Sequence, residues 1–553
     1  MAALSYHNKR ILIVDDQRPF LIMLRGVMNN LGATNVVIAN NGETAVSSCR
    51  KEKFDIVIAD LHLGSDKKNG FQLLEELRER KLISPSTLFI MVSADSERPV
   101  VLGSMEKRPD DFIIKPFSQA QINSRLSKAY QKRQTLLPIY KQISEKNYQA
   151  AADLCREFIQ HNQKYKQYCL MLLVELLWLL NQNEQALSIL KSLEKSQATP
   201  LPWVSVALAR TYMNQGKLND AIYAASGILN KRLFAADGLD ILAQCYSNRE
   251  DFEQAIEHIR KAIDTSPLSL KRQFLGCEIA RAAGDWTLAK ECCQAILSQT
   301  KRSVHRSVIH LCNYVRSILD EAEHADDKNQ RNKLQQEAMV AIERNRRDEL
   351  LTRTREAFDF EIFEELIGAR INVLDGRLLD AKLTLTRTQK DIDTRFDDYP
   401  IHLAPESMTL AYSLGEYEHG NWLMAQIKDS ELTEDPSTQF LVTRTERQQA
   451  QAQASYNKFS KEGRAFYAGG QYQAAYESFT KALELAPMNT GVTINLLQCM
   501  MKLFEMMEKP EPQMITRCRQ LFRTLESVPL TEQYKLKFDS IKGPLQDYIR
   551  RRR

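Results

Sequence analysis

The stretch Phe54-Asp55-Ile56-Val57-Ile58-Ala59-Asp60 decides the interpretation of the first part of this sequence. It is a short apolar run, rich in β-branched residues, that ends in a carboxylate. A strand buried on both faces of a parallel sheet has this continuous apolar pattern. We therefore expect a central parallel strand with Asp60 at its carboxyl end.

Other runs of the same kind also end in polar residues. They are Ile11–Val14 before Asp15 and Asp16, Leu88–Val92 before Ser93, and Phe112–Ile114 before Lys115. In an open α/β sheet the carboxyl ends of the strands meet at one crevice, where the strand order reverses. The pattern therefore predicts one site that combines these side chains with Asp60.

Crowded carboxylates, a hydroxyl and a lysine fit the transfer of a phosphoryl group to a carboxylate. The carboxylates repel one another, and Mg²⁺ prefers oxygen ligands from a few acids and water. With Asp15 and Asp16 holding the metal, Asp60 is available as the nucleophile. Lys115 and the Ser93 hydroxyl would then bind the phosphoryl oxygens.

These residues resemble the receiver domain of bacterial response regulators, the CheY-like family, over residues 8–130. The resemblance implies that Asp60 accepts a phosphoryl group from a sensor histidine kinase or a phosphotransfer protein. It also implies a Mg²⁺ cofactor, a catalytic lysine and a conformational switch. The implied metal ligands are Asp15, Asp16, Asp60 and the main-chain carbonyl of His62; Lys115 and Ser93 assist catalysis, and Ser93 and Phe112 form the switch.

The loop after Asp60 departs from the family pattern. Gly64 stands where the family usually has a proline, and residues 65–69 precede Gly70, which makes the loop longer than the family norm. We expect the loop to pack differently while Asp60 remains the acceptor. A degenerate receiver that no longer accepts phosphate is the alternative.

Strands and helices alternate throughout the first 130 residues. We expect a further strand at residues 36–39 and helices at residues 18–30, 42–50, 71–80, 97–106 and 119–132. Such alternation predicts a parallel sheet with helices on both faces. The expected fold is a flavodoxin-like receiver with a five-stranded parallel sheet, as the resemblance implies.

The strand signal ends after residue 132, and a helical repeat replaces it. Residues 456–487 and 236–267 have small residues where two helices would cross and a proline at the end of the second helix. This spacing resembles the tetratricopeptide repeat, in which helical hairpins stack into a superhelical solenoid. Weaker copies predict about five repeats of about 34 residues between residues 132 and 300.

Residues 301–455 are less regular. Residues 303–347 predict two long polar helices broken near 326–329, and repeat-like remnants return at Gly376 and Gly420. We therefore expect four segments. They are a receiver at 1–130, tetratricopeptide-like repeats at 132–300, divergent helical repeats at 301–455, and a repeat with capping helices at 456–553.

Composition narrows the class of protein. Lys and Arg number 75 against 70 Asp and Glu, and this small excess makes nucleic acid an unlikely partner. The ten cysteines have no metal-ligand spacing, so we expect buried, reduced thiols and a cytoplasmic location. The apolar segment 168–180 contains Glu175 and is too short for a membrane span, so we interpret it as a core helix.

The repeats predict a protein-binding output. The first helices would present Asp237, Asp240, Gln244 and Asn248 in one repeat and Asn457, Ser460, Arg464 and Tyr467 in another. We expect a two-component response regulator whose receiver modulates binding of a protein partner by the array. No enzymatic activity is expected beyond the receiver's own phosphorylation and dephosphorylation. The alternatives are an RNA- or DNA-associated regulator that uses basic repeat faces, and a constitutive scaffold with a silent receiver.

Overall fold

The computed structural model describes residues 4–64, 67–94, 108–161, 164–195, 201–231, 234–352, 356–507, 511–530 and 532–551. The helix expected at residues 97–106 lies outside them. The chain divides into two compact units. One is Met1–Leu288 with Gln294–Arg306, and the other is Ala289–Cys293 with Ser307–Arg553.

The first unit starts with a five-stranded sheet in the order β2-β1-β3-β4-β5, with every neighbouring pair parallel. Its strands are β1 (Arg10–Val14), β2 (Asn35–Ala39), β3 (Ile56–Asp60), β4 (Leu88–Ser93) and β5 (Asp111–Ile114). In the register, Ile58 of the central strand lies opposite Ile13 on one side and Ile90 on the other. The predicted sheet is confirmed, and its order reverses between β1 and β3.

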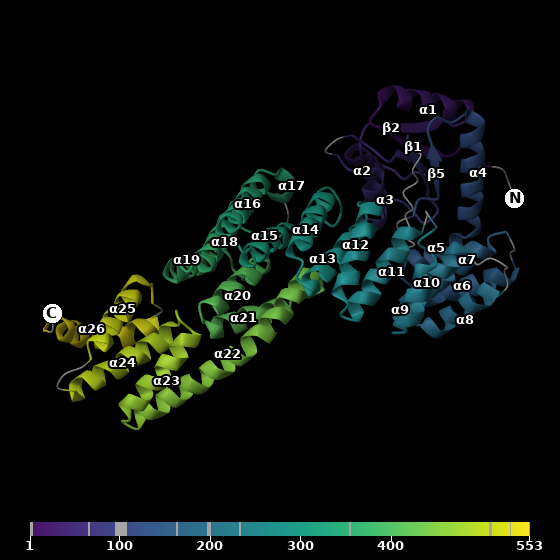
Figure 1. The fold of residues 1–553 in the computed structure, drawn as a ribbon. Coiled ribbons are helices and arrows are strands. Elements are labelled where there is room, and N and C mark those ends of the chain that lie inside the picture. Colours follow the sequence, from purple (N-terminus) through teal and green to yellow (C-terminus); the bar gives the residue numbers. More distant parts are fainter. Residues whose placement is uncertain are drawn as a thin grey trace. The chain divides into compact units, whose positions relative to one another are not determined.

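Two layers of helices cover this sheet (Figure 1). They are α1 (Arg18–Asn30) and α4 (Gln119–Thr135) on one face, and α2 (Gly42–Lys51) and α3 (Gly70–Glu79) on the other. In β3, Ile56 and Ile58 belong to the core under α1 and α4, whereas Val57 and Ala59 belong to the core under α2 and α3. Successive strand residues point to opposite faces, so a strand covered on both sides must be apolar throughout.

Paired helices follow the sheet directly, because Leu136 alone separates α4 from α5. The pairs are α5 (Leu137–Ser144) with α6 (Tyr148–His161), α7 (Lys166–Leu179) with α8 (Asn183–Lys195), α9 (Pro202–Asn214) with α10 (Leu218–Ser226), α11 (Ala235–Asn248) with α12 (Phe252–Thr265), and α13 (Leu270–Ala283) with α14 (Trp286–Thr300). These pairs are coloured from blue to teal in Figure 1. This succession of hairpins has the number and the spacing that the sequence predicted.

The second unit is also helical. Its elements are α15 (Val308–Glu323), α16 (Lys328–Arg346), α17 (Glu349–Thr352), α18 (Phe360–Leu374), α19 (Leu378–Arg395), η2 (Ile401–Leu403), α20 (Ala404–Ser413), α21 (Tyr417–Lys428), η3 (Glu431–Glu434), α22 (Pro436–Ala468), α23 (Tyr472–Leu485), α24 (Thr490–Met506), α25 (Pro512–Ser527) and α26 (Glu532–Arg551). Close helix packing explains the small residues of the repeat. A Cβ at Gly463 in α22 would lie 2.7 Å from the Phe479 ring in α23.

One expectation for the second unit is wrong in detail. Helix α15, expected as one of two long polar helices, is buried along almost its whole length, because its charged residues pair inside the unit. Arg316 donates to Glu406 over 2.7 Å, and Arg370 donates to Asp320 over 2.6 Å. The repeat-like remnant at Gly420 belongs to the pair α20 and α21, in which Gly420 packs against Tyr412 and the left-handed turn is at Gly415, where φ is +77°.

All ten cysteines are buried as thiols. Among the described residues, no helix is both long enough and apolar enough to cross a membrane.

Candidate functional site

The carboxyl ends of the strands bring charged side chains together, as predicted. Asp15 follows β1, Asp60 ends β3, and Lys115 follows β5. The Lys115 ammonium donates to Asp15 Oδ2 over 2.7 Å and lies 3.0 Å from Asp60 Oδ1. Lys115 therefore bridges two carboxylates that are 45 residues apart in the sequence, and they lie on either side of the point where the strand order reverses.

The three charges of this bridge are shielded from water. Asp15 is 1% exposed and Asp60 is 8% exposed, and the Lys115 ammonium lies 3.8 Å from the centre of the Phe20 ring. Burial raises the pKa of Asp60, Lys115 opposes this shift, and the nearby Asp15 charge adds to it. Two carboxylates facing one ammonium leave excess negative charge in a low-dielectric site, which favours a bound cation.

Main-chain donors hold the carboxylates in place. Asp15 Oδ1 accepts from the amide of Gln17 over 2.8 Å, and Asp60 Oδ2 accepts from the amide of His62 over 3.1 Å. Asp60 Oδ1 forms its ion pair with Lys115 but accepts no well-aligned hydrogen bond from the described residues. This oxygen is therefore available to a further positive group.

The loop after Asp60 returns to the site through Gly70. A Cβ at this residue would lie 2.5 Å from the Asp60 carbonyl oxygen and 2.6 Å from Met91 Sδ. Only glycine lets α3 start so close to the acceptor strand. Asn69 caps α3 in a reciprocal pair with Gln72, so the longer loop still ends in a well-defined helix start.

The remaining predicted residues surround this centre. Asp16 is exposed, and its Oδ2 is 3.6 Å from the position of a Cβ on Gly64. Ser93 is fully buried, and its carbonyl accepts from the Lys115 amide over 2.7 Å. Phe112 is partly buried, pairs with Met91 in the register and packs on the side of α2 and α3.

Mg²⁺ fits this donor set. Asp15, Asp16 and Asp60 supply hard oxygen donors, and the carbonyl of His62 follows Asp60 in the chain. Lys115 balances only part of their charge, which suits a divalent ion with oxygen ligands. The roles of these residues as ligands, catalysts and switch remain predictions.

The short linker after residue 132 favours packing of the receiver near the first helical pairs, but the individual contacts were not predicted. Arg108, just before β5, donates to Glu175 of α7 over 2.7 Å, and Gln72 of α3 donates to the carbonyl of Gln299 in α14 over 2.8 Å. The only signal for the first contact was a lone acid, Glu175, in an otherwise apolar helix. The second involves a main-chain acceptor, for which side-chain patterns give no signal.

The first helices of successive pairs carry charges of alternating sign. Burial raises the pKa of Asp237 in α11 to about 6, and the positive charges of Arg210, Arg272 and Lys271 oppose that shift. Asp240 accepts two hydrogen bonds from Arg272 of α13, over 2.7 and 2.8 Å.

The other predicted groove residues differ in their exposure to solvent. Asn248, Asn457 and Arg464 are exposed, Gln244 and Tyr467 are half-buried, and Ser460 is buried.

The fold and the site define a response regulator receiver domain followed by a tetratricopeptide-repeat region. Residues 11–127 match the family described as the response regulator receiver domain, and residues 236–267 match the tetratricopeptide repeat. The chain belongs to the response regulator receiver family through its N-terminal domain.

Curated relatives agree with this assignment. The chemotaxis protein CheY of Thermotoga maritima is 31% identical over 121 residues, which are 22% of this chain and 97% of CheY. The alkaline phosphatase synthesis transcriptional regulatory protein PhoP of Bacillus subtilis is 31% identical over 131 residues, 24% of this chain. The match spans only 52% of the length of PhoP.

Solved structures with similarity to this chain include two response regulators. One, from Thermotoga maritima, is 25% identical with a TM-score of 0.20, over 22% of this chain and 98% of that one. The other, from Burkholderia pseudomallei, contains a phosphorylated aspartic acid, a calcium ion and citrate. It is 22% identical with a TM-score of 0.20, over 28% of this chain and 99% of that one.

Proposed function

We propose that this protein is a two-component response regulator whose receiver accepts a phosphoryl group on Asp60 and whose repeats bind a protein partner. The observation that supports it most is the bridge from Lys115 to Asp15 and Asp60 at the strand ends. The donor would be a sensor histidine kinase or a phosphotransfer protein. The segments at 1–130, 132–300, 301–455 and 456–553 would be the receiver, two sets of helical repeats, and a final repeat with its capping helices.

The chemistry is a displacement at phosphorus. A carboxylate oxygen of Asp60 forms the new P–O bond, while the P–N bond of a donor phosphohistidine breaks and its electron pair stays on the imidazole. Asp15, Asp16, Asp60 and the His62 carbonyl would hold Mg²⁺, which would neutralise charge on the phosphoryl oxygens. Lys115 would exchange its contact with Asp60 for a phosphoryl oxygen, and Ser93 would donate to another.

The output would be protein binding by the repeat array. The exposed side chains at the predicted groove positions, Asn248, Asn457 and Arg464, would contact a polar peptide or helix of a partner. The receiver contacts the array at α7 through Arg108 and at the end of α14 through Gln72. Phosphorylation could therefore change how the array presents its binding face.

Acetyl phosphate with Mg²⁺ tests the acceptor assignment on the full-length chain. The wild type should gain one phosphoryl group, seen by intact-mass measurement, and Asp60→Asn should not. Asp55→Asn is the matched control. Asp55 is in the segment leading into β3, where it pairs with Lys9 over 3.1 Å, and this substitution should leave labelling unchanged. Labelling that persists in Asp60→Asn would reject the proposal, and a wild type that stays unlabelled would favour a silent receiver.

The output is tested by an affinity pull-down from lysate. Chain charged with beryllofluoride, a phosphate analogue, would be compared with uncharged chain, with charged Asp60→Asn as control. Proteins whose recovery depends on the charged state would be partners regulated by the receiver. Identical recovery in all three samples would contradict regulation of the array.

A further inference from the structure

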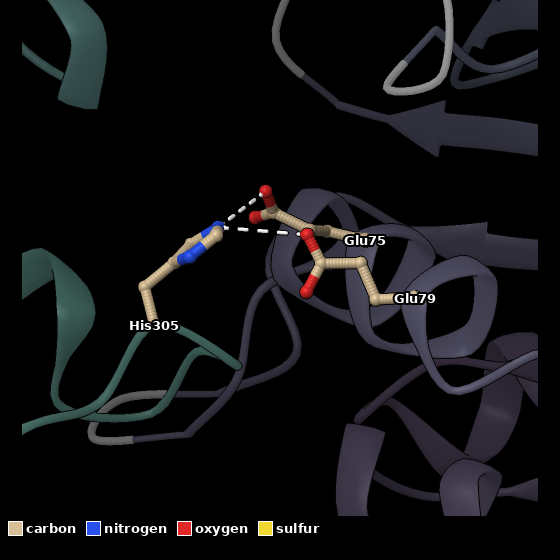
Figure 2. A group of neighbouring side chains, drawn as sticks. All are labelled: Glu75, Glu79 and His305. Carbon is tan, nitrogen blue, oxygen red and sulfur yellow. Dashed lines mark hydrogen bonds and ion pairs between the residues drawn. The ribbon is translucent and has the colours of Figure 1, made fainter. Parts of the chain in front are cut away.

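A second cluster of possible metal ligands lies outside the receiver site. Glu75 and Glu79 on α3 and His305, in the segment after α14, place ligand atoms within 4.8 Å of one another (Figure 2). His305 Nε2 is 2.8 Å from Glu75 Oε1 and 3.8 Å from Glu79 Oε1. We propose that Glu75, Glu79 and His305 form a binding site for a Zn²⁺-like divalent ion that joins α3 to the end of α14.

The spacing on α3 places both carboxylates on one helix face. Residues four apart in a helix are neighbours on its surface, and like charges at this spacing repel each other. Gln72 lies one turn earlier on the same face and donates to the carbonyl of Gln299 over 2.8 Å. This hydrogen bond fixes the face against the end of α14, so the carboxylates meet the imidazole in a defined position.

The segment that carries His305 is also held in place. The His305 amide donates to Ser303 Oγ over 3.1 Å, and the Ser303 amide donates to the carbonyl of Thr300 over 2.9 Å. Thr300 is buried at the end of α14. The imidazole therefore projects from a tight turn that is anchored to a helix. Figure 2 shows it facing the carboxylates of Glu75 and Glu79.

The chemistry and the dimensions fit an ion such as Zn²⁺. An imidazole nitrogen and carboxylate oxygens bind Zn²⁺ at about 2.0–2.2 Å, so tetrahedral ligands lie roughly 3.3–3.6 Å apart. The observed separations of 2.8 and 3.8 Å from Nε2 straddle that range, so small side-chain rotations suffice. Water would complete the coordination, because three protein ligands leave one tetrahedral position open.

The ligand types distinguish this site from the receiver site. Mg²⁺ demands oxygen ligands and retains water, whereas an imidazole ligand favours transition ions and Zn²⁺. The side chains are also reachable from solvent, since His305 is 36% exposed and Glu79 is 43% exposed. The inference does not depend on phosphorylation of Asp60.

Calorimetric titration of the full-length chain with Zn²⁺ tests the proposal. Millimolar Mg²⁺ in the buffer would compete for the oxygen ligands of the receiver site. The wild type should bind one Zn²⁺ at this cluster. His305→Gln and Glu75→Gln should each weaken binding at least roughly 10- to 100-fold, because removing even a partner that only orients a metal ligand typically costs that much. His161→Gln, at the exposed end of α6, is the matched control and should bind as the wild type does.

A second measurement detects the link between the two elements. Amide exchange in residues 300–306 and in α3 should slow when Zn²⁺ is added to the wild type, and not in His305→Gln. Circular dichroism checks that each variant folds; if His305→Gln does not, the more exposed Glu79→Gln carries the test. A wild type without Zn²⁺ binding, or unchanged affinity in folded His305→Gln and Glu75→Gln, would overturn the proposal and leave a simple ion pair.

Discussion

Arg108 Nη2 donates to Glu175 Oε1 over 2.7 Å, and this ion pair joins the segment before β5 to helix α7. Both side chains are about four-fifths buried. Burial raises the pKa of Glu175, and the charge of Arg108 opposes that shift. Removing Arg108 therefore leaves a largely buried carboxylate without this partner, which costs more than the loss of an exposed pair.

We predict a coupling free energy of about 1 kcal/mol or more between these two residues in a double-mutant cycle. The variants are Arg108→Met, Glu175→Gln and the double substitution, and the measurement is native-state amide exchange in α7. The exposed pair Lys261–Glu257 on α12 is the control and should give a smaller coupling. Equal couplings for the two pairs would show that the Arg108 contact has no special role.

Substitutions of the acids in the receiver site should weaken Mg²⁺ binding, and one of them should also stabilise the metal-free domain. Asp15→Asn and Asp16→Asn should each weaken Mg²⁺ binding, because each removes a proposed oxygen donor. Asp60→Asn should stabilise the metal-free receiver at neutral pH, because burial raises the pKa of Asp60 and so penalises its charged form. Calorimetry with Mg²⁺ and amide exchange in β1 and β3 are the measurements.

The sign of that stability effect depends on pH. A carboxyl whose pKa is raised by folding favours the native state at low pH, and this contribution is lost as pH rises through the folded pKa. The advantage of Asp60→Asn should therefore shrink as pH falls toward the ordinary pKa of aspartate, 3.8. An advantage that grows on acidification would contradict the predicted sign, and unchanged Mg²⁺ affinity would argue against Asp15 and Asp16 as ligands.

Asp237 in α11 provides a second pH-dependent test, in the repeats. Burial raises its pKa from 3.8 to about 6, despite the nearby positive charges of Arg210 and Arg272. Its charge should cost stability above pH 6 and progressively less toward pH 4. Asp237→Asn should therefore protect the amides of α11 by about 1–3 kcal/mol at pH 7.5 and by less at pH 5. Equal protection at both pH values would contradict the raised pKa.

The buried charges of the second unit should be sensitive to unbalanced substitution. Glu406 is fully buried and accepts from Arg316 over 2.7 Å and from Arg370 over 3.3 Å. Glu406→Gln leaves two buried guanidinium groups facing less negative charge, so we expect a loss of about 3–5 kcal/mol in the stability of this unit. Urea unfolding followed by helical circular dichroism measures this loss. The exposed Glu446→Gln is the control, and an equal effect there would contradict the prediction.

Much of the fold could be predicted because its signals are local. Continuous apolar runs that alternate with helical segments predict the parallel sheet, and small residues at fixed spacing predict the helical hairpins. The site was predictable for the same reason, since each of Asp15, Asp60 and Lys115 directly ends or follows such a run. Helix α15 was misjudged because its charges find partners on helices far along the chain, such as Arg370 on α18.

Register within the divergent repeats was also hard to predict. A repeat-like remnant was predicted at Gly420, whereas the turn of this hairpin is at Gly415 and Gly420 packs against Tyr412 inside α21. The contacts of Gln72 and His305 depend on how the stacked helical pairs bring the end of α14 next to α3. No residue spacing in the sequence predicts this long-range contact.

The last prediction concerns transmission from Asp60 to the repeats. A phosphoryl group on Asp60 adds charge beside Lys115, which already contacts that carboxylate, and near the end of β4, where Ser93 lies. The family resemblance implies that Phe112 on β5 then changes rotamer. Arg108 lies three residues before β5 and holds Glu175 on α7, so a shift of β5 should reach the first repeats.

We therefore predict that beryllofluoride with Mg²⁺ changes amide exchange between residues 135 and 200 as well as in the receiver. Ser93→Ala and Phe112→Ala should reduce this remote change more than they reduce phosphate uptake. Both residues belong to the proposed switch that relays the change from Asp60 to β5, whereas Asp60 itself accepts the phosphoryl group. Coupling of this kind typically amounts to about 1–3 kcal/mol, or roughly 5- to 150-fold in an equilibrium. Arg108→Met should weaken the remote change and leave uptake intact, because Arg108 lies at the contact with α7 and outside the Lys115 bridge. Changes that stop at residue 130 in the full-length chain would mean that the receiver and the repeats are tethered without communication.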